Sequence, residues 1–184
     1  MDATPDSTAT VAIVLAAGGG TRFRGDGHKL AARLDGDPLA TRAIRTAVDA
    51  AIGVVVVVTG AADLDEQIAS LKGPGIELHT VPNPAWADGQ ATSLQAGIAT
   101  ATRLGADAVV VGLAAQPFVT VEAWRRVAAS RSPIAVATYD GEARPPVRLH
   151  ASVWPDLPDS GDEGARRLIR LRPELVERIP CPGS

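Results

Sequence analysis

Four short apolar runs, separated by alanine-rich stretches, constrain the fold of this chain more than any other feature. The runs are continuous in apolar character, which is typical of strands covered on both faces. They span residues 11–15, 54–59, 76–81 and 108–113. The stretches between them have helical composition, at residues 39–51, 63–71 and 90–104. This alternation predicts an α/β protein with a mostly parallel sheet.

Local signals indicate where these helices begin and end. Pro38 precedes the helix at 39–51, near the first turn, where a missing N–H costs little. Asp63 is expected to cap the N-terminus of the second helix, and Gly73-Pro74 to end it. Gly105 is expected to end the third.

The pattern changes after residue 131, where a hairpin replaces the strand and helix alternation. Residues 134–138 and 147–149 flank Asp140-Gly141, a pair typical of tight turns, and predict late antiparallel pairing. Asp162 is expected to cap a helix that runs to about Arg172. A last short strand is expected at residues 175–179.

The composition is that of a globular domain. With 184 residues, 46% hydrophobic and 21% charged, we expect one domain at residues 11–180 and a loose tail at residues 1–10. The net charge of −3 argues against a nucleic-acid partner, because such proteins usually carry a basic face.

A cytoplasmic location is expected from three features. The single cysteine, Cys181, allows neither an intrachain disulfide nor a cysteine metal cluster. The polar, acidic segment at residues 1–10 does not resemble a secretory signal. The apolar run at residues 54–58 is too short to cross a bilayer, so no membrane association is expected.

The segment directly after the first run is the main candidate for ligand binding. Three glycines, Gly18 to Gly20, let the backbone approach a ligand closely and let successive N–H groups converge on an anion. Arg22 and Lys29 add the positive charge that a triphosphate requires. Two familiar phosphate-binding motifs are excluded. The dinucleotide fingerprint would need a glycine at the position of Phe23, and a Walker loop would need lysine after Gly25, where this chain has Asp26.

Three blocks resemble the MobA-like NTP transferases, the family of the molybdenum-cofactor guanylyl- and cytidylyltransferases. The first is the segment at residues 15–23 followed by Lys29, which is similar to the family's opening motif. The second runs from Asn83-Pro84 to Gly97 and has the spacing typical of the cytidylyltransferase (MocA-like) branch. The third, at residues 161–166, is similar to a Gly-Asp-x-Gly-Ala-Arg block. The resemblance covers roughly residues 11–172.

The resemblance implies a Rossmann-like, three-layer α/β/α nucleotidyltransferase fold and a reaction. A nucleotide, with CTP favoured, would be transferred to a phosphorylated cofactor precursor such as molybdopterin, with Mg²⁺ as cofactor and a molybdenum hydroxylase as a candidate partner. The implied catalytic residues are Arg22 and Lys29. The implied nucleotide-binding residues are Leu15, Ala16, Ala17, Gly18, Gly19, Gly20, Thr21, Arg22, Lys29, Asn83, Gly89 and Ser93.

This chain departs from the family where a metal-binding aspartate is usual. Ala115 occupies that place and cannot ligate Mg²⁺, so Asp162 is the best remaining carboxylate. Three explanations stay open: a site that recruits Asp162, a natural member with lost or changed activity, or a deliberately inactivated chain. The stretch from Arg22 to Lys29 is also two residues longer than usual, and Arg144-Pro145-Pro146-Val147 replaces the family's Arg-Gly-His-Pro-Val.

The remaining candidates are single histidine, tryptophan and arginine side chains. His28, His79 and His150 lack a metal-ligand spacing and are expected to be surface or packing histidines. Trp86 is a candidate pocket residue, and Arg166 a candidate phosphate contact.

Two further functions remain alternatives to the transferase. One is a nucleotide-binding or cofactor-binding protein without catalysis, or a carrier for a molybdoenzyme, which the absent aspartate at Ala115 suggests. The other is an NAD(P)H-linked reductase of the nicotine-blue type, which rests on the resemblance alone.

Overall fold

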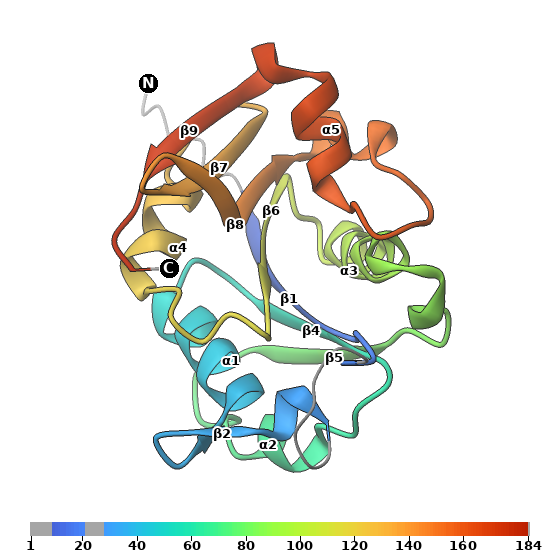
Figure 1. Ribbon diagram of the computed structural model, residues 1–184, viewed down its shortest axis with the longest axis vertical. Coiled ribbons are helices and arrows are strands. Elements are labelled where there is room, and N and C mark those ends of the chain that lie inside the picture. The colour runs from blue at the N-terminus through green and yellow to red at the C-terminus, as the bar shows by residue number, and fades with distance from the viewer. Residues whose placement is uncertain (1–8, 21–27, 184) are drawn as a thin grey trace, which may run out of the picture.

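A seven-stranded sheet forms the centre of the protein. The computed structural model describes residues 9–20 and 28–183, and the strand order is β5-β4-β1-β6-β8-β7-β9 (Figure 1). Strand β8 runs antiparallel to both of its neighbours, whereas every other adjacent pair is parallel. The strands are β1 Thr10–Ala16, β4 Val55–Thr59, β5 Leu78–Pro82, β6 Ala108–Leu113, β7 Ile134–Tyr139, β8 Glu142–His150 and β9 Val176–Pro180. The predicted α/β class and mostly parallel sheet are confirmed.

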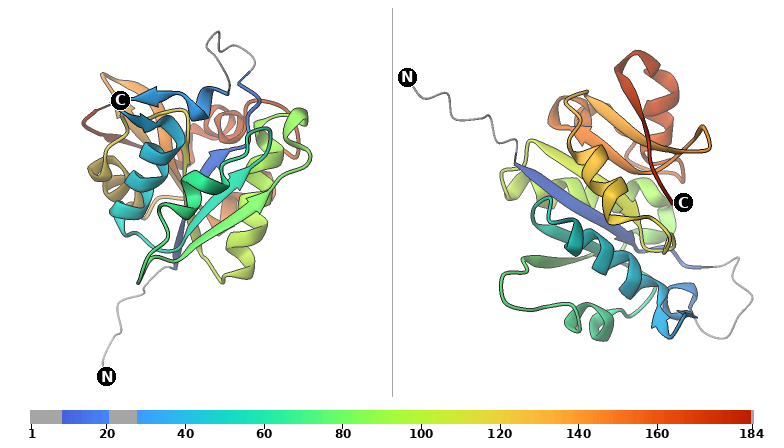
Figure 2. Two further views of the ribbon diagram at one scale, coloured as in Figure 1. Left: turned by 90° about the horizontal axis from the view of Figure 1, so that it is seen from below. Right: turned by 90° about the vertical axis from the view of Figure 1, so that its left-hand side faces the viewer.

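Helices cover both faces of the sheet and make three layers (Figure 2). Strand β1 shows why: Ile13 and Leu15 pack into the cluster that holds α3, whereas Val14 and Ala16 pack into the cluster that holds α1. Both sets are buried, so the strand carries no polar alternation. One face is covered by α1 Leu39–Ala50, α2 Asp65–Ala69 and α4 Val121–Ala128, and the other by α3 Gln90–Arg103 and α5 Ala165–Leu171.

Short elements complete the described chain. A two-stranded ribbon pairs β2 Arg33–Leu34 with β3 Asp37–Pro38. The 3-10 helices are η1 Lys29–Ala31, η2 Trp86–Asp88, η3 Ala151–Asp156 and η4 Pro173–Leu175. No helix among the residues described is long and apolar enough to cross a membrane.

The predicted hairpin is present. Asp140 and Gly141 both have positive φ, 52° and 85°, as a two-residue turn between twisted strands requires. Strand β8 folds back between β6 and β7, and β9 then adds in parallel at the outer edge of β7.

Two predicted caps are wrong. Helix α2 begins at Asp65 after Leu64, and Asp63 instead accepts a hydrogen bond from the Asp65 N–H (3.0 Å) in the turn before it. Helix α5 begins at Ala165, and its capping position is Gly164, with a φ of 50° and no side-chain cap. The carboxylate of Asp162 is therefore not used to cap a helix.

Helix α4 was not expected from the sequence. Thr120 caps it by accepting a hydrogen bond from the Ala123 N–H (3.1 Å), and Trp124 is buried against the sheet. A Cβ atom added at Gly112 of β6 would lie 2.5 Å from the Trp124 ring, so the missing side chain at residue 112 makes room for the indole.

Candidate functional site

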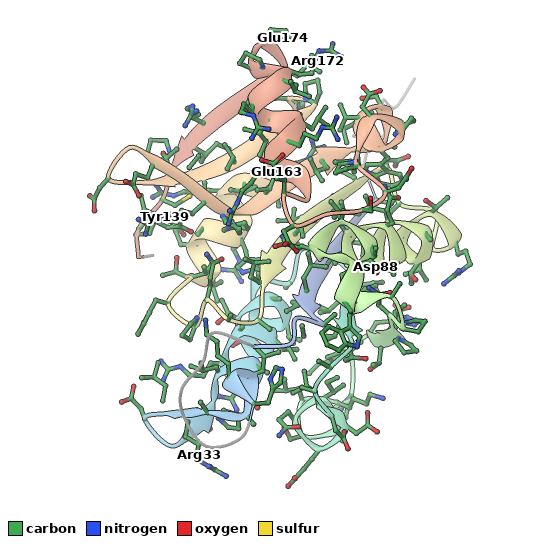
Figure 3. The ribbon with its side chains drawn as sticks, turned by 45° about the vertical axis from the view of Figure 1, so that its right-hand side comes forward. Arg33, Asp88, Tyr139, Glu163, Arg172 and Glu174 are labelled. Atoms are coloured by element: carbon green, nitrogen blue, oxygen red, sulfur yellow. The ribbon has the colours of Figure 1, made fainter. Side chains whose placement is uncertain are left out.

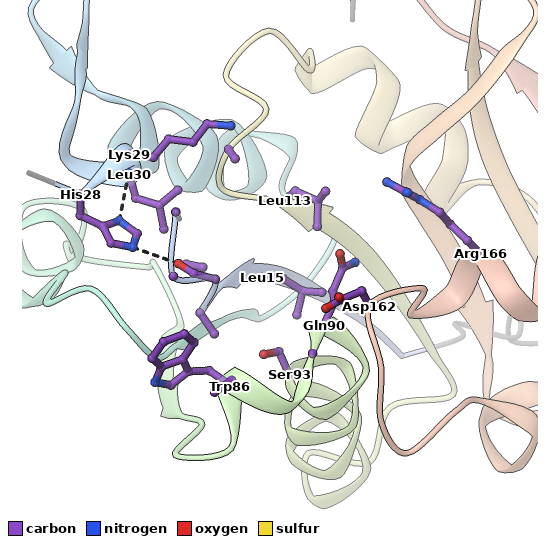
Figure 4. Close-up of a pocket in the computed structure, with 18 residues that line it drawn as sticks. Leu15, His28, Lys29, Leu30, Trp86, Gln90, Ser93, Leu113, Asp162 and Arg166 are labelled. Carbon is purple, nitrogen blue, oxygen red and sulfur yellow. Dashed lines mark hydrogen bonds between the residues drawn. The ribbon is translucent and has the colours of Figure 1, made fainter. Parts of the chain in front are cut away.

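A cavity of about 1110 Å³ opens where the ends of β1 and β6 meet (Figure 4). Strand β1 leads to α1 on one face of the sheet, and α3 on the other face leads to β6. Such a change of side leaves a crevice beyond the carboxyl ends of the two strands, where α/β proteins bind their ligands. The lining residues are Leu15, Ala16, Ala17, Gly18, Gly19, Gly20, His28, Lys29, Leu30, Trp86, Ala87, Gly89, Gln90, Ser93, Leu113, Ala115, Asp162 and Arg166.

The glycine segment forms one wall of this cavity. Gly18, Gly19 and Gly20 all line it, and within the described parts of the chain none of their N–H groups donates a hydrogen bond. Three consecutive amides thus have no acceptor among the described residues, and their binding of an anion stays a prediction. Thr21 and Arg22, the other two residues expected in this segment, lie outside the described residues.

Two cationic side chains approach the cavity from different elements. Lys29 begins η1, and Arg166 belongs to α5, and Figure 4 draws them on different sides of the cavity. Neither side chain makes a hydrogen bond or salt bridge to a residue that the structure describes. Both charges are thus available to an anionic ligand.

Glu163, which lies close in sequence to Arg166, pairs its carboxylate with Arg170 and not with Arg166. The carboxylate accepts two hydrogen bonds from Arg170, at 2.8 and 3.0 Å. Figure 3 labels Glu163. This hydrogen-bonded pairing holds the pKa of Glu163 below its ordinary value. Asp162 is left as the carboxylate that the described residues contribute to the cavity.

Contacts between distant segments place Asp162 there. The Ala91 N–H donates to the Gly161 carbonyl (2.9 Å), and the Gly161 N–H donates to the Asp88 carbonyl (3.0 Å). Gly89 has a φ of 106°, and a Cβ atom on it would lie 2.4 Å from the Gly161 carbonyl carbon. Only glycine at position 89 permits this approach, so the third sequence block rests against the start of α3.

Ser93 and Asn83 form a buried hydrogen-bonded pair beside the cavity. Asn83 does not line the cavity: its Nδ2 donates to Ser93 Oγ and to Thr92 Oγ1, both at 2.9 Å, and its Oδ1 accepts from the Ala85 N–H. Both Nδ2 hydrogens of Asn83 are used within the protein, so the side chain has no donor left for the predicted contact with a nucleobase or ribose. Ser93 does line the cavity, and no described residue accepts its hydroxyl proton. The pair thus presents Ser93 as a donor.

The donor set does not fit a divalent cation held by the protein alone. Ala115 lines the cavity at the end of β6 and has no oxygen ligand in its side chain. In residues 9–20 and 28–183 no group of three or more histidine, cysteine, aspartate or glutamate side chains is placed to bind a metal. Asp162 is the one carboxylate that the described residues supply. Because Mg²⁺ sites use one or two carboxylates together with phosphate oxygens and water, a metal ion here would need the phosphates of a ligand.

Five lining residues were not predicted as site residues from the sequence: His28, Leu30, Ala87, Gln90 and Leu113. His28 had been read as a surface or packing histidine. Gln90 begins α3, a helix that the sequence predicted, whereas Leu30 belongs to η1, which it did not. Trp86 lines the cavity, which agrees with its reading as a pocket residue.

Comparison with known proteins identifies a family and two similar curated proteins. The model of the MobA-like NTP transferase domain matches residues 12–178. The purine catabolism protein PucB of Bacillus subtilis (strain 168) is 30% identical over 171 residues, which are 87% of this chain and 80% of that protein. The nicotine blue oxidoreductase of Paenarthrobacter nicotinovorans is 30% identical over 187 residues, 96% and 89% of the two chains.

Solved structures share the fold at low identity. A nucleotidyl transferase from Methanothermobacter thermautotroptrophicus has a TM-score of 0.79 at 21% identity, covering 95% of this chain and 88% of its own. The manganese complex of Rv0371C from Mycobacterium tuberculosis H37Rv has a TM-score of 0.71 at 20% identity, covering 95% and 89%. The inositol-1-phosphate CTP transferase from T. maritima has a TM-score of 0.68 at 17% identity, covering 94% and 86%.

Proposed function

Because this chain belongs to the MobA-like NTP transferase family, we propose that it binds a nucleoside triphosphate in the cavity and transfers the nucleotide to a phosphorylated acceptor. The supporting observation is the cavity wall formed by Gly18 to Gly20, whose amides donate to no residue that the structure describes, with Lys29 beside it. CTP is the nucleotide we favour, and a molybdopterin-like precursor the acceptor, in keeping with the spacing of the second sequence block. A molybdenum hydroxylase is the partner that such a product would serve.

In the proposed reaction an oxygen of the acceptor phosphate attacks the α-phosphorus of CTP. A new bond forms between that oxygen and the α-phosphorus, the bond from the α-phosphorus to the bridging oxygen breaks, and pyrophosphate leaves with the electron pair. Negative charge grows on the oxygens around phosphorus and on the leaving group. The amides of the glycine segment and the Lys29 ammonium group would stabilise this charge, and Arg166 would hold the acceptor phosphate. We expect Arg22, together with Lys29, to offset the negative charge of the triphosphate and of the transition state.

Ser93 and Gln90 would orient the substrates. Ser93 offers its hydroxyl proton to a substrate oxygen, and the side chain of Gln90 can both donate and accept. Holding two substrates in line lowers the barrier without covalent catalysis by the protein. We infer that Mg²⁺ enters only as a complex with the nucleotide phosphates, with Asp162 as its carboxylate contact among the described residues.

The first experiment measures pyrophosphate release from each nucleoside triphosphate with Mg²⁺ and a molybdopterin precursor. Lys29→Ala should weaken CTP binding and turnover, because it removes a cation at the phosphates. Lys72→Ala is the matched control, since Lys72 is the other lysine of the chain and does not line the cavity. Equal effects of the two changes, or no pyrophosphate with any nucleotide, would refute the proposed transfer.

A second prediction concerns the missing carboxylate. Ala115→Asp should increase Mg²⁺-dependent turnover, because it adds a second carboxylate to a cavity in which the described residues supply only Asp162. Ala115→Asn is the control: asparagine has nearly the shape of aspartate but no charge, so this variant should have the turnover of the wild type. The comparison is made by titrating Mg²⁺ at saturating CTP. If wild type and Ala115→Asp have the same turnover and metal dependence, Ala115 does not limit catalysis.

The alanine at position 115 also supports a second candidate function, nucleotide or cofactor binding without transfer. The similarity to an enzyme named nicotine blue oxidoreductase makes NADPH a ligand to test. A thermal-shift comparison of CTP, GTP, ATP and NADPH, each with and without Mg²⁺, separates the candidates, because a ligand that binds the native state raises its apparent stability. Tight binding of CTP without pyrophosphate release favours a binding protein or carrier, whereas selective binding of NADPH favours a reductase.

A further inference from the structure

We propose that His28 is a positioning residue that holds the glycine segment in the orientation that receives phosphate. It does so by donating a hydrogen bond from its imidazole to the Gly18 carbonyl, and thereby turning the next amide away from itself. This inference deepens the proposed function and rests on it, because it assigns His28 a part in binding the phosphates of the nucleotide.

The hydrogen bonds around His28 define its tautomer. The Leu30 N–H donates to His28 Nδ1 (3.2 Å), which caps the first turn of η1. A nitrogen that accepts a hydrogen bond carries no proton, so the proton of the neutral ring is on Nε2. Nε2 lies 3.0 Å from the Gly18 carbonyl oxygen, to which it donates. Both ring nitrogens are therefore used, one on each side of the imidazole (Figure 4).

This contact determines the direction of an amide. The peptide that joins Gly18 to Gly19 is planar and trans, so its C=O and N–H point in opposite directions. Because the carbonyl faces His28, the Gly19 N–H faces away from the imidazole, and no described residue accepts its hydrogen. Without the His28 contact, a glycine peptide has low resistance to rotating about its flanking bonds.

The imidazole also lies beside the far end of the glycine segment. Gly20 has a φ of 62°, and a Cβ atom added to it would lie 3.4 Å from both His28 Nε2 and the Lys29 Cβ. His28 thus hydrogen-bonds the first glycine and leaves no spare room for a side chain on the third. The same cap that fixes the ring begins η1, which carries Lys29 into the cavity wall.

Two substitutions separate the contact to Gly18 from the cap of η1. In His28→Asn the side-chain oxygen occupies the position of Nδ1 and keeps the cap, since asparagine is a good capping residue, but no atom reaches Gly18. In His28→Gln the amide nitrogen is as many bonds from Cα as Nε2 and can donate to Gly18, whereas the cap is lost. The pair therefore tests orientation of the glycine segment against local stability.

The measurement is the dissociation constant of CTP and of inorganic tripolyphosphate by calorimetry, with thermal unfolding of each variant. We expect His28→Asn to bind both probes about 3- to 10-fold more weakly, the effect of losing one hydrogen bond. His28→Gln should bind within about 2-fold of wild type although its melting temperature falls. Wild-type affinity in His28→Asn, or equal losses of affinity in both variants, would overturn the proposed role.

A second readout needs no nucleotide. Nitrogen-15 spectra of the free protein should show His28 protonated at Nε2 and unprotonated at Nδ1, and the opposite tautomer would overturn the inference. If wild type binds neither CTP nor tripolyphosphate, the proposed function fails, and the tautomer still decides whether His28 holds Gly18. If wild type binds both probes and His28→Asn binds them equally well, the inference alone fails.

Discussion

Replacing Asn83 tests whether ligand binding depends on a buried hydrogen-bond network behind the cavity. Asn83 is only 5% exposed, and its side chain makes three hydrogen bonds. The amide nitrogen donates to Thr92 and Ser93, and the amide oxygen accepts from the Ala85 N–H at 3.0 Å. Asn83→Asp keeps the oxygen that faces Ala85 but replaces the donor by an acceptor. The Ser93 hydroxyl can then turn its proton toward the new carboxylate and away from the cavity.

The two possible changes at this position differ in size. Asn83→Ala removes three hydrogen bonds at about 1 kcal/mol each and leaves the Ala85 N–H without its acceptor, so we expect about 3 to 4 kcal/mol less stability. Asn83→Asp loses two bonds, gains one from Ser93 and buries a carboxylate, so it also lowers stability, and its distinguishing effect should be on the ligand. Loss of one hydrogen bond from Ser93 to CTP corresponds to about 3- to 10-fold in the dissociation constant.

Urea unfolding measures the stability, and calorimetry with CTP measures the affinity. Ser93→Ala is the control, because it removes the same proton from the cavity and leaves the bond from Asn83 to Thr92 in place. Both changes remove the same interaction, the hydrogen bond from Ser93 to the ligand. The double variant of Asn83→Asp with Ser93→Ala should therefore bind CTP no more weakly than either single variant. Additive losses of affinity, or unchanged CTP binding in Asn83→Asp, would refute this account of the network.

Three further predictions concern stability. Burial raises the pKa of Tyr139 to about 12, so the folded state keeps its phenolic proton to a higher pH than the unfolded state. The free energy of unfolding should therefore fall by about 2 to 3 kcal/mol as the pH rises from about 10 to 12. Urea unfolding at alkaline pH measures this fall, and Tyr139→Phe should remove it. Tyr139 is the single tyrosine of the chain, so phenolate absorbance reports its titration directly, and a midpoint near pH 10 would contradict the prediction. Gly97→Ala should cost about 1 kcal/mol in urea unfolding, because its Cβ atom would lie 2.9 Å from Ile13 Cγ2 and this crowding exceeds the gain in helix propensity; a more stable variant would contradict the packing. Arg148 is 4% exposed and donates from Nη1 to the Ser132 carbonyl (2.8 Å), and its Nε has no partner among the described residues. Arg148→Met should therefore leave thermal stability unchanged or raise it by up to about 2 kcal/mol, and a loss of stability would show that the buried charge is stabilising.

The parallel strands could be predicted because burial on both faces acts on composition directly. In β1 and β4 every position from Val11 to Leu15 and from Val55 to Val58 is buried, so each strand reads as an unbroken apolar run. The hairpin turn was predictable for a different reason. Asp140 and Gly141 both need positive φ, a requirement that few residue pairs meet at low cost.

The order of the late strands and the presence of α4 could not be read in the same way. Strand β8 lies between β6 and β7, and that position depends on side-chain packing across the sheet, whereas the hairpin signal specifies only that two strands are neighbours. Helix α4 has eight residues, and its signals are limited to the Thr120 cap and a buried stripe that contains Trp124 and Val127. A segment of this length gives little periodic pattern.

In the candidate site too, local features could be predicted from the sequence and contacts between distant segments could not. The glycine segment and Lys29 were predicted because their chemistry is local: glycine torsions and a cation that follows the end of a strand. Asp162 was predicted both to cap a helix, which is wrong, and to be the best remaining carboxylate for a metal, which stays a prediction. Its place at the cavity depends on two hydrogen bonds of the preceding residue, from the Gly161 N–H to the Asp88 carbonyl and from the Ala91 N–H to the Gly161 carbonyl. His28 was missed because its contact with Gly18 spans ten residues and leaves no periodic trace in the sequence.

Binding and turnover are expected to depend on different parts of this cavity. The amides at Gly18 to Gly20, the Lys29 side chain and Ser93 all line the cavity, and in the proposed function each would interact with a ligand oxygen in the ground state. In the proposed reaction a carboxylate at position 115 would act through a metal ion mainly on the leaving pyrophosphate, where catalysis needs stabilisation that ground-state binding does not supply. Ala115→Asp should therefore change turnover much more than CTP affinity measured without Mg²⁺, whereas Lys29→Ala should change both. If instead Ala115→Asp alters metal-free affinity as strongly as turnover, the two parts of the cavity do not act separately.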